Sequence, residues 1–194
     1  GIIIAPIGGV IFGMVLVGII IAVFAKRRPA VVNRTFGRLQ IISSTWFALT
    51  HGANDGQKTM GIIVLILFSA DLISEIHMPL WVILAAASAM SLGTFFGGYK
   101  VIKTLGLRIT RLKPYQGFAA ETGGGIMLAA FAILGIPAST THAITGSVMG
   151  AGAARRIRAV RWKVSRQIIF SWVITIPGAA GLAIAFTYII HLFV

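Results

Sequence analysis

Long apolar stretches alternate with short polar connections along this chain. Residues 2–25, 80–98 and 167–194 contain no Asp, Glu, Lys or Arg. A helix needs about 20 consecutive, mostly apolar residues to cross the hydrocarbon core of a bilayer, which is about 30 Å thick. The pattern therefore predicts an all-α transmembrane protein, a helical bundle with spanning helices at these three stretches.

A further apolar stretch, residues 39–70, contains a polar segment at residues 51–58. As one straight helix it would be about 48 Å long at 1.5 Å per residue, well beyond the thickness of the hydrocarbon core. Two glycines and the pair Asn54 and Asp55 lie near its middle. The stretch therefore predicts a helix that is broken within residues 51–58, where unpaired carbonyl and N–H groups would be available to ions.

The basic residues form three clusters, at residues 26–38, 100–113 and 155–166, which hold every Lys and Arg except Lys58. The net charge of +13 would by itself suit a nucleic-acid-binding protein. Basic clusters between apolar stretches are instead typical of the cytoplasmic loops of membrane proteins. With all three clusters inside, both termini and the loop at residues 71–79 lie outside. The expected partner is a lipid bilayer, and no nucleic acid is expected.

Residues 114–154 lie between two basic clusters, so this topology requires them to leave and return to the same side. Two full crossings or a re-entrant hairpin would satisfy that requirement. The sequence Gly135-Ile136-Pro137 suits the tip of a hairpin. Non-helical backbone at membrane depth is tolerated where protein or water surrounds it. We favour the re-entrant hairpin.

Composition excludes several classes of protein. Hydrophobic residues make up 57% of the chain and charged residues only 11%, and the mean hydropathy is +0.94. Soluble domains have about a quarter charged residues. The chain has no cysteine, which excludes disulfides and thiolate metal sites. No cofactor is expected, and metal ligation stays unassigned.

Two of the four acids, Asp55 and Glu121, fall within stretches that are predicted to lie at membrane depth. A carboxylate at membrane depth costs about 3 kcal/mol or more unless it is paired, protonated or hydrated, so each is a functional candidate. The alternative is a structural ion pair or interhelical hydrogen bond. For Asp55 the obvious partner is Lys58, one helical turn away. Asp71 and Glu75 lie in the predicted outer loop and are interpreted as solvated charges.

Three consecutive hydroxyl residues, Ser139, Thr140 and Thr141, precede an apolar helix. Ser139 or Thr140 suits an N-cap, and a helix N-terminus binds anions through its free N–H groups and its dipole. The hydroxyls add donors without adding fixed charge, which suits an anion that must be released again. An ordinary capped helix start is the alternative.

His142 follows directly as a candidate proton relay, helix cap or partner that orients Asp55 or Glu121. A structural hydrogen bond is the more common role of a single buried histidine. The three glycines at residues 123–125 are interpreted as a place of close helix packing, because they lack the lysine and strand of a nucleotide-binding loop.

Three of these segments resemble a known family. Residues 51–61 (HGANDGQKTMG) and 137–146 (PASTTHAITG) resemble the paired signatures of the inorganic phosphate transporter (PiT) family, and residues 117–124 (GFAAETGG) also match. The resemblance extends over residues 38–194. In that family two homologous, inverted halves each carry both motifs and enclose one phosphate near the membrane midplane. This chain has one copy of each and is similar to the C-terminal half. Residues 1–194 are therefore expected to be one transmembrane domain of a longer chain, whose N-terminal half or a second copy completes the transporter.

By this resemblance, Asn54 and Asp55 help to bind the coupling cation and phosphate, residues 139–141 contact phosphate oxygens, and Glu121 supports coupling. Sodium-coupled members resemble Asn-Asp-x-x-Asn at the first motif, whereas Lys58 holds the last position here. That departure favours a proton as the coupling ion, or a metal–phosphate complex as the substrate, over sodium. The resemblance implies a secondary active phosphate symporter, a multi-pass protein of a bacterial plasma membrane.

Other functions stay open as alternatives. A few relatives carry sulfate, so a sulfate permease of the same family is one, and a passive channel and a non-transporting scaffold subunit are others. Ser139, His142 and Asp55 include the residue types of a hydrolytic triad. A triad is defined by its geometry, and no nucleophile elbow is present. The chain is therefore not expected to be an enzyme.

Overall fold

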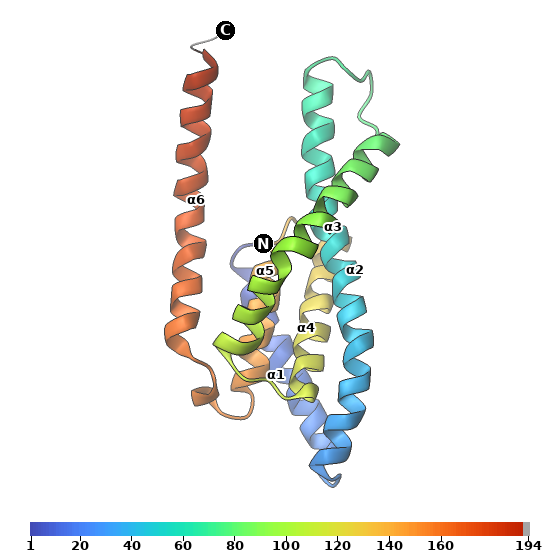
Figure 1. Ribbon diagram of the computed structural model, residues 1–194, viewed down its shortest axis with the longest axis vertical. Helices are drawn as coiled ribbons and strands as arrows, with labels where there is room; N and C mark the ends of the chain where they lie inside the picture. Colours follow the sequence, from blue (N-terminus) through green and yellow to red (C-terminus); the bar gives the residue numbers. More distant parts are fainter. Residues whose placement is uncertain (192–194) are drawn as a thin grey trace. The chain divides into compact units, whose positions relative to one another are not determined.

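The computed structural model of the protein describes residues 1–191, apart from the side chains of residues 100 and 102. Within this range every regular element is helical (Figure 1), as the apolar pattern predicts. The elements are α1 (Ile4–Phe24), α2 (Pro29–Ser69), α3 (Leu80–Lys103), a π-helical segment (Thr104–Ile109), α4 (Pro114–Ile133), α5 (Thr140–Ala153), a 3-10 turn (Ile157–Ala159) and α6 (Trp162–His191).

Helices α1, α2, α4 and α5 form a bundle, in which α1 packs mainly against α5 and α2 mainly against α4. Helix α4 also packs against α1 and α5, and α3 packs against α2. A buried cluster that includes Leu128, Phe131, Ala138 and Ala143 lies where α4 turns into α5. Residues from Arg161 onward form a separate unit, which consists of α6 in the described part of the chain.

The described part of the chain contains three helical segments that are long and apolar enough to cross a membrane, at Ile4–Phe24, Leu80–Ile109 and Trp162–His191. These are the three stretches that the apolar pattern predicts. Large apolar side chains on their outer faces are exposed in the protein alone, for example Ile7 and Ile11 on α1. Exposed apolar surface on this scale marks a membrane protein.

The prediction of a broken helix at residues 51–58 is wrong, because α2 runs without interruption through 41 residues. The polar side chains in this segment bond to one another along the helix, and they do not interrupt its backbone hydrogen bonds. Asp55 is paired with His51 and with Lys58, and Thr59 donates to the Asp55 carbonyl. Glycine in a helix costs only about 1 kcal/mol. Unpaired backbone groups in apolar surroundings would cost more, so the helix continues.

The hairpin of residues 114–154 forms as predicted. Residues 134–139 connect α4 to α5, and Gly135 at the turn has φ of 64°, a conformation that favours glycine. The Ile136 N–H bonds back to the Phe131 carbonyl at 2.9 Å and closes the end of α4. Helix α5 has 14 residues, so it is about 21 Å long. That length falls short of a full crossing and favours the re-entrant arrangement.

Glycines allow α1 and α5 to approach closely. A Cβ atom added at Gly146 or Gly150 would meet the backbone of Pro6 or Val10 on α1, and one added at Gly9 would meet the backbone of α5. Gly123 on α4 lies against Phe12 in the same way, which confirms the predicted packing role of the 123–125 glycines. Small residues at helix interfaces are typical of membrane proteins because they let backbones pack directly.

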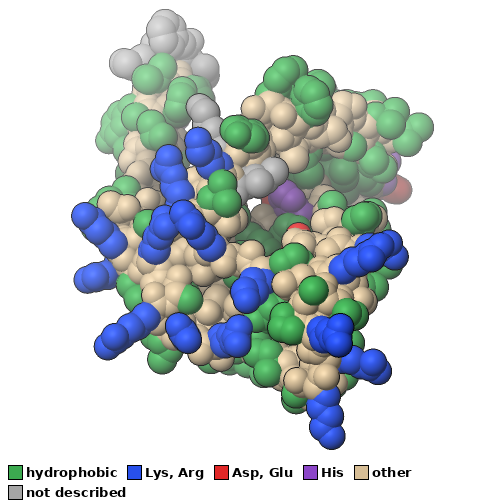
Figure 2. Space-filling model, turned by 60° about the horizontal axis from the view of Figure 1, so that its bottom comes forward, with side chains coloured by type: hydrophobic (Ala, Val, Ile, Leu, Met, Phe, Trp, Pro, Cys, Tyr) green, Lys and Arg blue, Asp and Glu red, His purple; other side chains and the backbone are tan. Residues whose placement is uncertain are grey.

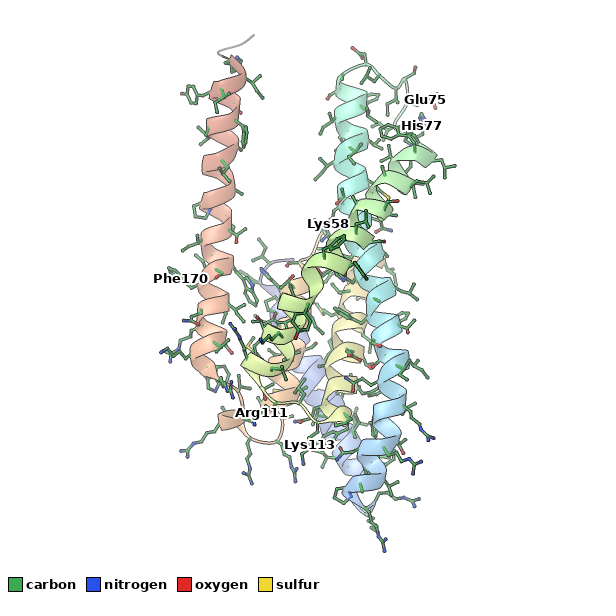
Figure 3. The ribbon with its side chains drawn as sticks, viewed as in Figure 1. Lys58, Glu75, His77, Arg111, Lys113 and Phe170 are labelled. Carbon is green, nitrogen blue, oxygen red and sulfur yellow. The ribbon has the colours of Figure 1, made fainter. Side chains whose placement is uncertain are left out.

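The basic connections of residues 1–160 lie at one end of the bundle. The α1–α2 connection, the start of α4 and the end of α5 meet there (Figure 1), and Figure 2 shows Lys and Arg side chains gathered on this face. Figure 3 shows Arg111 and Lys113 at this end, whereas Glu75 and His77 lie in the loop at the far end of α2 and α3. The arrangement agrees with the predicted topology, in which these connections share one side of the membrane.

Candidate functional site

A polar cluster centres on Asp55, on the face of α2 that meets the tip of the hairpin. Asp55 Oδ2 lies 3.0 Å from His51 Nε2 and accepts a 2.9 Å hydrogen bond from Thr140 Oγ1. Asp55 Oδ1 lies 2.9 Å from Lys58 Nζ. His51, Asp55 and Lys58 share one face of α2 because they are spaced by four and three residues. The carboxylate is partly buried and is fully engaged by these partners.

The start of α5 supplies the other side of the cluster. Ser139 is the N-cap, and its Oγ accepts a 3.4 Å bond from the His142 N–H, as the sequence predicts for this position. Thr140 is buried and faces Asp55, whereas the Thr141 side chain is exposed. Lys58 Nζ also donates to the Ala138 carbonyl just before the helix, so α2 contacts the hairpin tip at two points. The three hydroxyl residues therefore have different surroundings.

Asn54 lies beside the cluster and is only 4% exposed. Its Oδ1 has no hydrogen-bond partner among the described residues. Asn54, Gln57 and Lys58 line one wall of a pocket of about 180 Å³, and the residues of the hairpin turn, from Gly135 to Pro137, line another wall. A buried polar atom normally has a partner, so an unsatisfied one beside a pocket indicates a position for a ligand or a water molecule.

Glu121 belongs to a second, separate polar group. Its Oε2 accepts a 2.5 Å hydrogen bond from Ser43 Oγ, and its Oε1 lies 3.3 Å from Gln40 Nε2. Ser43 precedes Asp55 by twelve residues on α2, which corresponds to about 18 Å along the helix. The structure therefore does not bring Glu121 into the Asp55 cluster. No pattern in the sequence indicated the contacts with Gln40 and Ser43.

Comparison with known proteins identifies the family. The family model described as "Phosphate transporter family" matches residues 4–183. The chain belongs to this family. It is 48% identical over 180 residues to the probable low-affinity inorganic phosphate transporter of Rhizobium meliloti (strain 1021), covering 92% of this chain and 54% of the relative. It is 37% identical over 191 residues to the protein of the same name in Bacillus subtilis (strain 168), covering 98% and 57%.

A solved structure described as "The sodium-dependent phosphate transporter" is also similar. It superimposes with a TM-score of 0.66 at 34% identity, over 75% of this chain and 37% of that one. The chain spans about half the length of the two curated relatives. The fold is thus that of part of a phosphate transporter family protein.

Within this phosphate transporter family chain, His51 is a site residue that sequence reasoning considered less probable as a relay and did not connect with Asp55. Its contact with Asp55 follows from the spacing of four residues on a continuous helix, and the expectation of a broken helix hid that signal. His142, which the sequence offers as a relay or as a partner of Asp55 or Glu121, lies near the backbone of Ile2 on the α1 side. This contact of His142 fits a structural role.

The arrangement suits a reversible binding site for a small anion. The first N–H groups of α5 have no intrahelical partners, as at every helix start, and the helix dipole favours negative charge there. Lys58 adds one positive charge, which the Asp55 carboxylate offsets. Neutral donors next to a balanced ion pair bind an anion less tightly than an unopposed cation would. Such a site can release its ligand.

Proposed function

We propose that the chain forms one half of the phosphate pathway of a secondary active transporter, which moves inorganic phosphate across the cell membrane together with a cation. The observation that carries this proposal is the contact of Asp55 and Lys58 with the start of α5, in a chain of the phosphate transporter family. The names of the curated relatives, which are inorganic phosphate transporters, support the substrate.

Phosphate binds beside the hairpin tip in this proposal. The Asn54 side chain lines a pocket beside the hairpin turn, and we assign Ser139 and Thr141 at the start of α5 to the phosphate oxygens. Thr140 donates to Asp55 and so links the anion site to the carboxylate. A matching set of motifs, from the other half of the transporter or from a second copy, completes the enclosure of the anion.

The coupling ion in this proposal is a proton rather than sodium. Lys58 Nζ lies 2.9 Å from Asp55 Oδ1. The lysine therefore occupies the carboxylate oxygen that a bound metal cation would need as a ligand. Two unit positive charges 4 Å apart repel by about 4 kcal/mol at an effective dielectric constant of 20. A metal–phosphate complex is the second possibility, because the complex brings its own cation.

The decisive experiment measures uptake of radiolabelled phosphate by proteoliposomes that contain the full-length transporter. We expect accumulation that follows an imposed proton gradient and that unlabelled phosphate inhibits more strongly than equimolar sulfate. Stronger inhibition by sulfate would make the protein a sulfate permease. Uptake that is saturable but never exceeds the external concentration would indicate a passive channel, and no uptake by well-inserted protein would indicate a scaffold.

A further inference from the structure

A second pocket lies at the basic end of the bundle, far along α2 from the Asp55 cluster, and we propose that it binds the phosphate headgroup of an anionic phospholipid. The pocket has a volume of about 280 Å³ and is formed by the end of α1, the start of α2, the start of α4 and Arg155, two residues past the end of α5. All of these residues belong to the same compact unit. The predicted transport site uses none of them.

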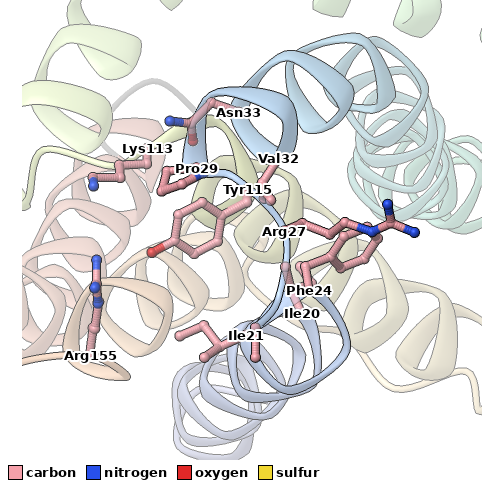
Figure 4. Close-up of a pocket in the computed structure, with 11 residues that line it drawn as sticks. Ile20, Ile21, Phe24, Arg27, Pro29, Val32, Asn33, Lys113, Tyr115 and Arg155 are labelled. Atoms are coloured by element: carbon pink, nitrogen blue, oxygen red, sulfur yellow. The ribbon is translucent and has the colours of Figure 1, made fainter.

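The polar side chains of the pocket converge on one side. Figure 4 shows the Lys113 amine and the Arg155 guanidinium on the side toward which the Tyr115 hydroxyl points, with Asn33 nearby. Arg27 extends away on the opposite side. Tyr115 is 8% exposed, and its hydroxyl has no hydrogen-bond partner within residues 1–191. Two cations and a phenol form a set of donors suited to a phosphate oxygen.

A buried side chain ties together the backbone segments that carry the two cations. The Lys113 backbone N–H donates to Gln116 Oε1 at 3.0 Å, and Gln116 Nε2 donates to the Ala151 carbonyl at 3.0 Å. Gln116 therefore ties the start of α4 to the last turn of α5, one turn before Arg155. A site that is organised before binding avoids part of the entropy cost of association.

The positive charge of the pocket is not balanced by the protein. Within the described residues, Lys113 and Arg155 form no ion pair, because the ion pairs there are those of Asp55. The acids Asp71 and Glu75 lie in the loop at the other end of α2. Pro29 and Pro114 begin α2 and α4 at this pocket, so two positive helix ends add to the excess. This excess of positive charge favours the binding of an anion from outside the protein.

The apolar walls favour a lipid over a free anion. Ile20, Ile21, Phe24 and Val32 line the pocket beneath its polar side. The outer face of α1 continues from it with exposed apolar side chains, including Val23 at 68% and Ile19 at 52% exposure. A lipid places its phosphate among the cations and its chains along this face. Basic pockets between transmembrane helices on the cytoplasmic side bind such headgroups in other membrane proteins.

Thermal unfolding of the purified full-length transporter in detergent tests the proposal. The additives are short-chain phosphatidylglycerol, short-chain phosphatidylcholine and inorganic phosphate, each titrated separately. We expect phosphatidylglycerol to raise the Tm more than phosphatidylcholine does. In the double variant Lys113→Gln, Arg155→Gln, the apparent Kd for phosphatidylglycerol should rise roughly tenfold or more, since each basic residue contributes about 1 kcal/mol to binding of anionic lipid.

The matched control removes two other cations of the same clusters, in the double variant Lys103→Gln, Arg158→Gln, whose side chains are exposed and do not line the pocket. It should retain the response to phosphatidylglycerol. Equal losses in both double variants would mean a diffuse surface charge effect and would overturn the proposal. Loss of the response to inorganic phosphate in the Lys113, Arg155 double variant would also overturn the proposal, because the pocket would then be a site for the free anion. For the unmodified protein, equal stabilisation by both lipids would overturn it without any variant.

Discussion

Asp55 is the residue on which the most contacts of the candidate site depend. It holds His51, Lys58 and Thr140 together, and removal of its charge leaves Lys58 without a counter-ion. We expect Asp55→Asn to reduce phosphate uptake to less than about a tenth, because a hydrogen bond to a charged group contributes about 1.5–3 kcal/mol. Uptake into proteoliposomes, normalised to inserted protein, measures the effect. Asp71→Asn in the exposed loop is the control and should transport normally.

Thr140 and Thr141 are neighbours in the sequence with different surroundings, which makes them a matched pair. Thr140→Val removes the donor to Asp55 from a buried position, whereas Thr141→Val changes an exposed side chain. If both hydroxyls bound phosphate only, the two variants would weaken uptake equally. We expect Thr140→Val also to change how uptake depends on the imposed pH gradient, and Thr141→Val to change only the apparent KM, by several-fold.

At the scale of the helix, the turn of the hairpin could be predicted because Gly135 and Pro137 are local signals for the end of one helix and the start of another. The continuity of α2 could not be predicted, because it depends on side-chain bonds among residues 51–58 that offset the destabilising effect of the glycines. The link from Asp55 to Thr140 joins residues 85 positions apart. No periodicity in the sequence encodes such a contact, so the motifs indicated the residues of the site and the fold was needed to pair them.

The α1–α5 contact gives a prediction about packing. Gly146→Ala would place a Cβ atom against the backbone of Pro6, which cannot move aside as a flexible side chain can. Overpacking of this kind costs about 1–3 kcal/mol. We expect the Tm of the purified transporter to fall by roughly 3–10 °C. Gly18→Ala on α1 is the control, because no atom outside its own helix lies within 4 Å of the added Cβ. A similar fall in both variants would contradict tight packing at Gly146.

At the scale of the whole molecule, the polar features are separated along the bundle. The basic connections lie at one end, and the Asp55 cluster lies about 40 Å along α2 from its start, where it contacts the hairpin tip. Re-entrant segments need protein or water around their tips. The side chains of α2 provide part of that surrounding, and the residues at the start of the chain provide another part, since Gly1 lies against Pro137 and Ala138. In our proposal the anion site is completed where this part of the transporter meets the other half or a second copy.

The coupling ion is a property of the assembled transporter, and Lys58 is the residue that decides it in our proposal. Its ammonium occupies Asp55 Oδ1 and the Ala138 carbonyl, two oxygen atoms that would otherwise suit a sodium ion. Uptake should therefore persist when choline replaces sodium and should increase with an inward proton gradient. Lys58→Asn should lower this uptake and make the remainder respond to sodium, because the repelling charge is gone.

Lys58→Arg separates the charge of this residue from its size. An arginine keeps the positive charge beside Asp55, so uptake in this variant should stay independent of sodium even where a changed contact with Ala138 lowers the rate. Both variants and the unmodified protein are compared in radiolabelled phosphate uptake with sodium or choline outside, at two imposed pH gradients. Strict dependence of the unmodified protein on sodium, the ion named for the similar solved transporter, would refute proton coupling. Lys58 would then serve only to fix the hairpin tip against α2.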